Sequence, residues 1–234
     1  MYKVNEVFLS LQGEGPMVGA PAVFVRFAGC NLACPFCDTQ HETFNEMNQN
    51  TLLDAIDNEI ADIGSERDGF PVVLTGGEPL LQMDDDLVDL LHDRNFQVHV
   101  ETNAMEDTYL RAKKAPFEYL GKCDEVVASP KGYEWSTAIV ELATALKVVV
   151  PLPSGLDMED LADMARLVRS NRLEEVPPSL FLQPVTPGGG GVPDWDERFQ
   201  ANCKEARDRA FDLWGRHQQR WRVLPQTHVW MGIQ

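Results

Sequence analysis

Short apolar runs alternate along the chain with longer amphipathic stretches. β-Branched and aromatic residues are typical of strands, and we expect strands at residues 4–11, 22–28, 71–74, 96–100, 125–128, 146–150, 180–182 and 221–224. Helical periodicity predicts helices at residues 51–63, 85–92, 107–114, 157–169 and 194–219. This alternation is typical of a parallel sheet whose strands are joined by helical crossovers.

The number of strand–helix units distinguishes a complete barrel from a partial one. Roughly six units fit into the sequence, whereas a complete (β/α)8 barrel takes ~250 residues. We therefore expect an α/β fold with a parallel sheet, in the form of a partial, incomplete TIM-like barrel. The sequence has no internal repeat, so residues 1–234 are expected to form a single domain. Its C-terminal helix and tail, residues 194–234, are expected to close the site.

Three of the five cysteines, Cys30, Cys34 and Cys37, lie in one short loop directly after the strand expected at 22–28. Their C-x3-C-x2-C spacing lets three thiolates point toward one centre. A zinc site usually has four ligands from paired motifs, and the sequence has no second C-x2-C pair. Buried free cysteines or disulfides also leave the spacing unexplained. An iron–sulfur cluster with one iron open to an outside ligand explains it best.

Polar motifs follow several expected strands at their carboxyl ends, where α/β folds build their sites. The motifs are Gly76-Gly77-Glu78-Pro79, Glu101-Thr102-Asn103, Ser129-Pro130-Lys131 and Gln183-Pro184. The two glycines let the backbone approach a ligand closely because no Cβ intervenes, and the glutamate or the backbone can then receive an ammonium group. Taken alone, each motif is equally typical of a turn or a helix cap.

Two single residues and one loop have a structural as well as a functional explanation. Arg26 interrupts an apolar strand, and a buried arginine needs an acidic partner or a ligand; a salt bridge is the commoner explanation. A lone histidine such as His228 is more often structural. The glycine-rich segment 186–193 is most simply a connector, since a phosphate loop would need a helix beginning at its glycines.

The net charge and the hydropathy of the chain argue against nucleic-acid and membrane partners. The chain has 20 basic and 37 acidic residues, a formal net charge of −17. Phosphate contacts need a basic face, so we expect no nucleic-acid partner. No apolar stretch approaches the ~20 residues that cross a bilayer, and the first residues do not resemble a secretory signal. Because an odd cysteine count also fits a reducing compartment, we expect a cytoplasmic protein without a membrane partner.

The cysteine loop resembles that of the radical S-adenosylmethionine superfamily. In that superfamily the open iron binds S-adenosylmethionine, which the reduced cluster cleaves to a 5′-deoxyadenosyl radical. Other motifs resemble, more specifically, the 7-carboxy-7-deazaguanine synthase family. These motifs are Gln12-Gly13-Glu14-Gly15, Arg26 to Leu32, Cys37-Asp38-Thr39, Thr75 to Pro79 and Ser129-Pro130-Lys131. The resemblance covers most of the chain, but segments 40–50 and 194–219 match no motif, so roles there stay open.

The resemblance implies a role for each matching residue. The catalytic 4Fe–4S cluster would be held by Cys30, Cys34 and Cys37. S-Adenosylmethionine would contact Phe36, Cys37, Asp38, Gly77, Glu101, Asn103, Ser129, Pro130, Lys131 and Gln183. The Thr39 hydroxyl would bind a Mg²⁺ that also touches the substrate carboxylate, which suits an ion that keeps waters and ligand oxygens. The substrate would contact Leu11, Gln12, Gly13, Glu14, Arg26, Thr75, His228 and the terminal carboxylate of Gln234.

The implied reaction converts 6-carboxy-5,6,7,8-tetrahydropterin to 7-carboxy-7-deazaguanine with release of ammonia, in the biosynthesis of queuosine-type 7-deazapurines. The resemblance also implies a homodimer and a reducing partner such as flavodoxin or ferredoxin. Other functions remain open. A glycyl-radical-enzyme activase would use the same cysteine loop without needing Gln12 to Glu14 or Arg26. A non-catalytic iron–sulfur electron carrier would not need Gly76 to Pro79, and a zinc-binding module would bind zinc stoichiometrically.

Overall fold

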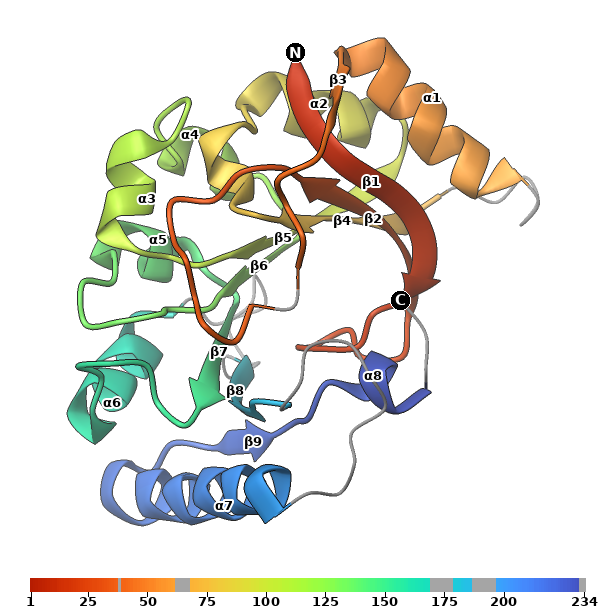
Figure 1. Ribbon diagram of the computed structural model, residues 1–234. Coiled ribbons are helices and arrows are strands. Elements are labelled where there is room, and N and C mark those ends of the chain that lie inside the picture. The colour runs from red at the N-terminus through yellow and green to blue at the C-terminus, as the bar shows by residue number, and fades with distance from the viewer. Residues whose placement is uncertain (38, 62–67, 169–178, 187–196, 232–234) are drawn as a thin grey trace.

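One curved sheet forms the centre of the molecule (Figure 1). The computed structural model describes residues 1–37, 39–61, 68–168, 179–186 and 197–231. The sheet has nine strands in the order β3-β1-β2-β4-β5-β6-β7-β8-β9. Within the described ranges β3 and β9 are its two edges and do not pair with each other, so the barrel is open.

The sheet begins with antiparallel strands and continues with parallel ones. β1 (Tyr2–Leu11) pairs antiparallel with β2 (Pro21–Phe27) and with β3 (Asn45–Met47). The strands parallel to β2 are β4 (Phe70–Gly76), β5 (Phe96–Thr102), β6 (Glu125–Ala128), β7 (Ala145–Val150), β8 (Ser179–Pro184) and β9 (Trp221–Val223). All carboxyl ends of the parallel strands therefore lie at one edge of the sheet.

Helices cover the outer side of the sheet (Figure 1). They are α1 (Gln49–Glu59), α2 (Asp85–Asp93), α3 (Glu106–Arg111), α4 (Phe117–Leu120), α5 (Thr137–Leu142), α6 (Met158–Leu167) and α7 (Glu197–His217). The short η2 (Pro79–Leu81) follows β4, and α8 (Thr227–Met231) lies near the carboxyl end of β1. In the described part of the chain we find no helix with the length and apolar character of a membrane span.

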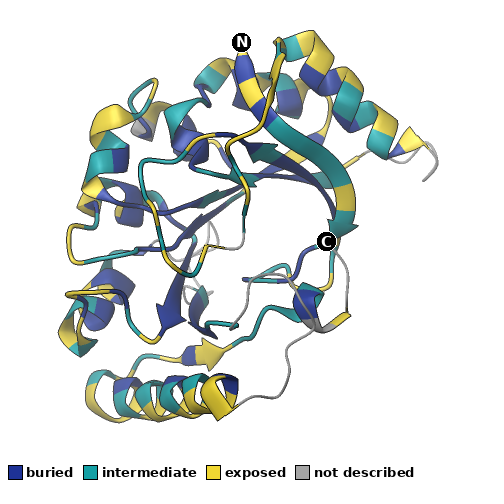
Figure 2. Cartoon of the chain, viewed as in Figure 1, coloured by how far each residue is buried: buried dark blue, intermediate teal, exposed yellow. Residues whose placement is uncertain are grey.

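The strand alternation explains which side chains enter the barrel. Side chains two apart on a strand share a face. Val23, Val25 and Phe27 of β2 belong to the large core between sheet and helices, whereas Ala22 and Phe24 belong to a separate interior cluster. Arg26 shares the inner face with those two residues. Figure 2 shows the strands largely buried beneath the more exposed helices.

The expected α/β fold with a partial barrel and parallel sheet is confirmed. Most strand predictions are also confirmed within a few residues, but β3, α4, α5 and α8 were not predicted. The helix expected at 51–63 starts earlier, at Gln49, because the Asn48 side chain caps it by accepting a hydrogen bond of 2.9 Å from Thr51 N. The ends of the predicted helices at 62–63, 169 and 194–196 lie outside the described residues.

Candidate active site

A single cavity opens at the carboxyl ends of the parallel strands and receives most of the residues predicted to form the site. Its wall contains Leu11, Gln12, Gly13, Glu14, Arg26, Cys30, Cys34, Phe36, Cys37, Thr39, Thr75, Gly77, Glu101, Asn103, Ser129, Lys131, Gln183 and His228. Pro130 is buried but does not line it. Asp38 and Gln234 lie outside the described residues.

The cysteine loop forms one side of this cavity. Cys30, Cys34 and Cys37 are free thiols, and burial raises the pKa of the Cys30 and Cys34 thiols. The loop is held by a hydrogen bond of 3.1 Å from Cys37 N to Cys34 O. No three His, Cys, Asp or Glu side chains among the described residues are arranged to hold a single metal ion. Three thiols around one cavity instead suit a cluster whose iron atoms lie apart.

Asn31 fastens the cysteine loop to the strand ends. Its amide donates to Thr108 Oγ1 at 2.9 Å and to Asp107 Oδ2 at 3.1 Å. Its Oδ1 accepts from Asn103 Nδ2 at 3.0 Å, and the Thr108 hydroxyl lies 2.5 Å from Asn103 Oδ1. Thr108 is fully buried, so this network links the loop to α3 and to the carboxyl end of β5.

The two glycines after β4 pack against the base of the cysteine loop. A Cβ on Gly77 would lie 1.9 Å from Gly29 O, and one on Gly76 would lie 2.4 Å from Phe27 N. Gly76 also has a φ of +111°, which L side chains rarely adopt. Both glycines line the cavity, so their backbone is available to a ligand. The close backbone approach predicted from the sequence is thus present, and it brings the two glycines against the base of the cysteine loop.

The Glu78 side chain accepts hydrogen bonds from groups in and beside this turn and does not line the cavity. It is fully buried and accepts from Leu80 N at 3.1 Å, from Thr102 Oγ1 at 2.8 Å and from Asn103 N at 2.8 Å. Burial raises its pKa to about 7, although these hydrogen bonds act in the opposite direction. Because both oxygens are already bonded, the cavity-facing backbone of the glycines is the better receiver for an ammonium group.

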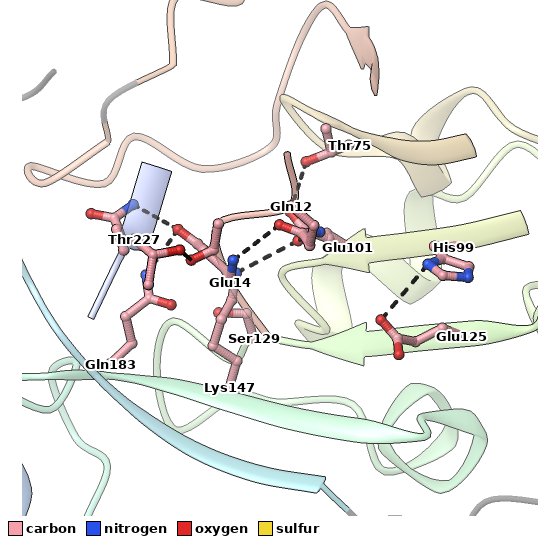
Figure 3. Close-up of polar contacts among 12 residues, drawn as sticks. Gln12, Glu14, Thr75, His99, Glu101, Glu125, Ser129, Lys147, Gln183 and Thr227 are labelled. Atoms are coloured by element: carbon pink, nitrogen blue, oxygen red, sulfur yellow. Dashed lines mark hydrogen bonds and ion pairs between the residues drawn. The ribbon is translucent and has the colours of Figure 1, made fainter. Parts of the chain in front are cut away.

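Glu14 and Lys147 form a buried ion pair in the cavity wall (Figure 3). Lys147 Nζ donates to Glu14 Oε2, and Glu14 Oε1 accepts from Gln183 Nε2 at 3.1 Å and Gln226 Nε2 at 2.7 Å. Burial alone would raise the pKa of Glu14. The charge of Lys147, the hydrogen bonds from Lys147 and Gln226, and the charge of His228 outweigh burial and lower the pKa to about 2.

Glu101 forms a second anchored carboxylate beside this pair (Figure 3). Its Oε1 accepts from Gln12 Nε2 at 3.1 Å and lies 4.0 Å from Lys147 Nζ. Its Oε2 accepts from Thr75 Oγ1 at 3.1 Å. The sequence predicted Glu101 for the S-adenosylmethionine site and Gln12 and Thr75 for the substrate site. The contacts therefore join the two sets of predicted residues.

Arg26 has both a salt bridge and a position in the cavity wall. Its Nε lies 2.9 Å from Glu6 Oε1, and its guanidinium lies over the Phe8 ring. Its Nη1 donates to Thr39 Oγ1 at 3.1 Å. Arg26, itself predicted for the substrate site, thereby contacts the residue predicted for Mg²⁺.

Lys131 lies near the cysteine loop at the end of β6. Its Nζ donates to Ser129 Oγ at 2.6 Å and lies 5.9 Å from the centre of the Phe36 ring. Burial lowers the pKa of the Lys131 ammonium, and the charge of Lys147 lowers it further. Ser129, Lys131 and Phe36 thus gather on the side of the cavity that holds the cysteines.

The segment before and within α8 completes the wall next to Glu14. Thr227 N donates to Gly13 O at 2.9 Å, and the Thr227 hydroxyl donates to the same oxygen at 3.0 Å. These bonds dock the segment on the loop that follows β1. His228 and Gln226 line the cavity from this segment.

Lys147 and Gln226 are cavity residues that the sequence interpretation missed. A signal for Lys147 was present, because it is a single charge within the apolar run 145–150, as Arg26 is within 22–28. Gln226 carries no comparable signal, since a glutamine in a loop is ordinary.

The chain is similar to known proteins over nearly its whole length. Residues 24–134 match the model of the Radical SAM superfamily. The chain is 33% identical to the 7-carboxy-7-deazaguanine synthase of Bradyrhizobium diazoefficiens and 35% identical to that of Burkholderia multivorans, each over 99% of both chains. With the synthase of Bacteroides thetaiotaomicron it is 52% identical over 103 residues, 44% of this chain and 52% of that protein. The crystal structure of QueE from Escherichia coli, 24% identical, has a TM-score of 0.62 and covers 96% of this chain and 93% of that chain.

A parallel α/β sheet with a three-cysteine loop at its carboxyl edge is the architecture of a radical S-adenosylmethionine enzyme. The chain belongs to the 7-carboxy-7-deazaguanine synthase family of that superfamily. Membership implies a 4Fe–4S cluster and S-adenosylmethionine as cofactors. It confirms the family and the enzyme class predicted from the sequence, and it disfavours the activase, electron-carrier and zinc-module alternatives.

Proposed function

We propose that the cavity converts 6-carboxy-5,6,7,8-tetrahydropterin to 7-carboxy-7-deazaguanine with release of ammonia. The observation that carries the proposal is that one cavity joins the cysteine loop to the anchored carboxylates and Arg26. A cofactor at the loop and a substrate at the carboxylates would then be neighbours. Holding two reactants in contact is the main contribution that a protein makes to cofactor-borne chemistry.

The cysteine side of the cavity is our proposed cofactor site. Cys30, Cys34 and Cys37 would hold the cluster, which with S-adenosylmethionine supplies a 5′-deoxyadenosyl radical when both are bound. The cavity-facing backbone of Gly76 and Gly77 offers carbonyl groups to the methionyl ammonium. Other cofactor contacts are proposed for Phe36, Asp38, Glu101, Asn103, Ser129, Pro130, Lys131 and Gln183.

The part of the cavity around Glu14 and Arg26 is our proposed pterin site. Glu14 is ionised and accepts hydrogen bonds, so it can receive N–H donors from the guanidine-like edge of a pterin. Arg26 has a fork of donors suited to the substrate carboxylate, and its contact with Thr39 would bring a Mg²⁺ on that hydroxyl next to the same carboxylate. Further substrate contacts are proposed for Leu11, Gln12, Gly13, Thr75, His228 and Gln234.

The wider setting of the enzyme follows from the same proposal. Reduction of a cluster needs an external electron donor, for which flavodoxin or ferredoxin is suitable. We propose a homodimer in the cytoplasm, built from a single domain in which the segment around α8 closes the cavity. The net charge of −17 supports the absence of a nucleic-acid partner.

The proposal is tested by anaerobic turnover. Reconstituted protein, a chemical reductant, S-adenosylmethionine, Mg²⁺ and 6-carboxytetrahydropterin are incubated together, and mass spectrometry measures 7-carboxy-7-deazaguanine. We expect product in many-fold excess over protein while S-adenosylmethionine stays largely intact. Slow formation of 5′-deoxyadenosine without the deazaguanine product would reject the pterin as the substrate. Omission of Mg²⁺ should lower the rate if Thr39 binds the ion as proposed.

A further inference from the structure

Lys147 is a buried cation in a cavity that contains two anchored carboxylates. Its side chain extends from β7 to Glu14 Oε2, and its Nζ also lies 4.0 Å from Glu101 Oε1. Lys147 is only 7% exposed, so its pair with Glu14 is shielded from water. A buried carboxylate without a cationic partner tends to take up a proton.

The surroundings of Glu14 show why one cation decides its state. The charged groups that face it are Lys147 from β7, His228 from α8, Lys131 after β6 and, next to Lys147, Glu101 from β5. Its other contacts are the neutral amides of Gln183 and Gln226. Of these groups, only Lys147 forms a direct ion pair with Glu14 among the described residues.

We propose that Lys147 is a positioning residue, which keeps Glu14 ionised and oriented as the acceptor for the N–H edge of the substrate. This role rests on the proposed function. A carboxylate has about four acceptor positions, and the described residues fill three of those on Glu14. Counting only the described residues, one position on Glu14 remains for a substrate donor. A protonated Glu14 would instead present a hydrogen to the N–H donors of a pterin and repel them.

The test compares Lys147→Met with the wild type in the turnover assay at pH 6.5 and pH 8.5. In the wild type Glu14 is ionised at both values, since its pKa is about 2. In the variant we expect KM for the pterin to rise about tenfold at pH 6.5, and the ratio of variant to wild-type KM to fall at pH 8.5 as Glu14 ionises again. Taking the ratio cancels titration of the substrate.

A second background keeps the test decisive if Lys147→Met folds poorly. In the Glu14→Gln background residue 14 is neutral, so Lys147 has no carboxylate there to keep ionised. Adding Lys147→Met should then change KM by less than about threefold. Lys147→Arg should restore most of the affinity, whereas Lys122→Met, which removes a surface lysine paired with Asp89, should leave KM unchanged. Equal KM ratios at both pH values, or the same Lys147→Met effect with and without Glu14, would overturn the role of Lys147. Absence of product from the wild type would instead reject the proposed function.

Discussion

The His228 ring occupies the space that a side chain on Gly13 would need. A Cβ on Gly13 would lie 1.9 Å from His228 Nδ1 and 2.6 Å from its Cγ. The same glycine accepts both hydrogen bonds from Thr227. Gly13 follows β1 near one end of the sheet and α8 follows β9 at the other, so this contact joins segments from the two ends of the open sheet in the cavity wall.

We predict that Gly13→Ala damages substrate binding through this contact. The added methyl group must displace the His228 ring or the loop, and with it the wall that carries Gln226. KM for the pterin should rise about tenfold or more, because a wall residue of the binding site is moved. Steady-state turnover and iron content, measured on the same samples, would show a substrate defect with a normal cluster.

Two further variants control this prediction. Gly215→Ala changes a glycine in α7 with nothing within 4 Å of the added Cβ, and it should leave KM unchanged. In a His228→Gly background every side-chain atom of the clash is absent, so Gly13→Ala should add little to the loss that His228→Gly causes alone. An additive loss in the double variant would contradict the contact as the cause.

Arg26 is predicted to need its guanidinium fork. Its Nε pairs with Glu6 and its Nη1 donates to Thr39, at 2.9 and 3.1 Å, a span that one lysine ammonium does not reproduce. Arg26→Lys should lower kcat/KM for the pterin by about tenfold or more, and Arg26→Ala should abolish turnover. Equilibrium binding of S-adenosylmethionine and the cluster absorbance should stay as in the wild type.

The matched control is Arg94→Lys, which alters an exposed arginine that pairs with Asp57 at 3.1 Å. Surface pairs contribute little, so turnover should not change. Full pterin turnover by Arg26→Ala would remove Arg26 from the substrate site.

Thr108 is predicted to stabilise the cofactor side of the cavity. Thr108→Val keeps the shape but removes the hydroxyl that contacts both Asn31 and Asn103. Their amide groups then lose a buried partner, which should cost about 1–3 kcal/mol of unfolding free energy. The affinity for S-adenosylmethionine, measured by equilibrium binding, should fall as Asn103 loses its fixed orientation. Thr137→Val, at an exposed position of α5, should alter neither quantity, and an equal loss of affinity there would argue against the network.

Glu125 is predicted to make stability depend on pH. Burial and the charge of Glu101 raise its pKa to about 7, well above the value of about 4.3 in an unfolded chain. Between these values the folded protein holds a proton that the unfolded chain has released, so the contribution of Glu125 to stability falls as pH rises. Urea unfolding of the cluster-free protein should show Glu125→Gln near wild-type stability at pH 5. At pH 8 the variant should be more stable, by up to about 3 kcal/mol.

The difference in unfolding free energy between Glu125→Gln and the wild type removes the contribution of neighbouring titratable groups. His99, 3.9 Å from Glu125, has a pKa lowered by burial and titrates with the opposite sign, but it is present in both proteins and cancels. Glu141→Gln, at an exposed position of α5, should shift stability equally at the two pH values. The same outcome for Glu125→Gln would contradict the raised pKa.

Most strands could be predicted from the sequence because they are short runs rich in β-branched and aromatic residues. β3 (Asn45–Met47) was missed because it has no β-branched or aromatic residue, unlike the equally short β9, and α8 was missed because five residues are too few for a periodic pattern. The cysteine loop was recognised from spacing within eight residues. The ion pair of Lys147 with Glu14 was not, because its members are 133 residues apart and meet only through the order of the strands. A single charge in an apolar strand indicates that a partner exists, but only the fold identifies that partner.

In the proposed reaction, one cavity holds the cofactor carbon that carries the radical next to the ring carbon of the pterin. The most direct test is turnover of 6-carboxytetrahydropterin deuterated at C6, followed by mass spectrometry of the recovered S-adenosylmethionine. We expect deuterium in the recovered cofactor together with formation of 7-carboxy-7-deazaguanine. Product formed without any deuterium in S-adenosylmethionine or 5′-deoxyadenosine would contradict direct hydrogen transfer between the two neighbours in this cavity.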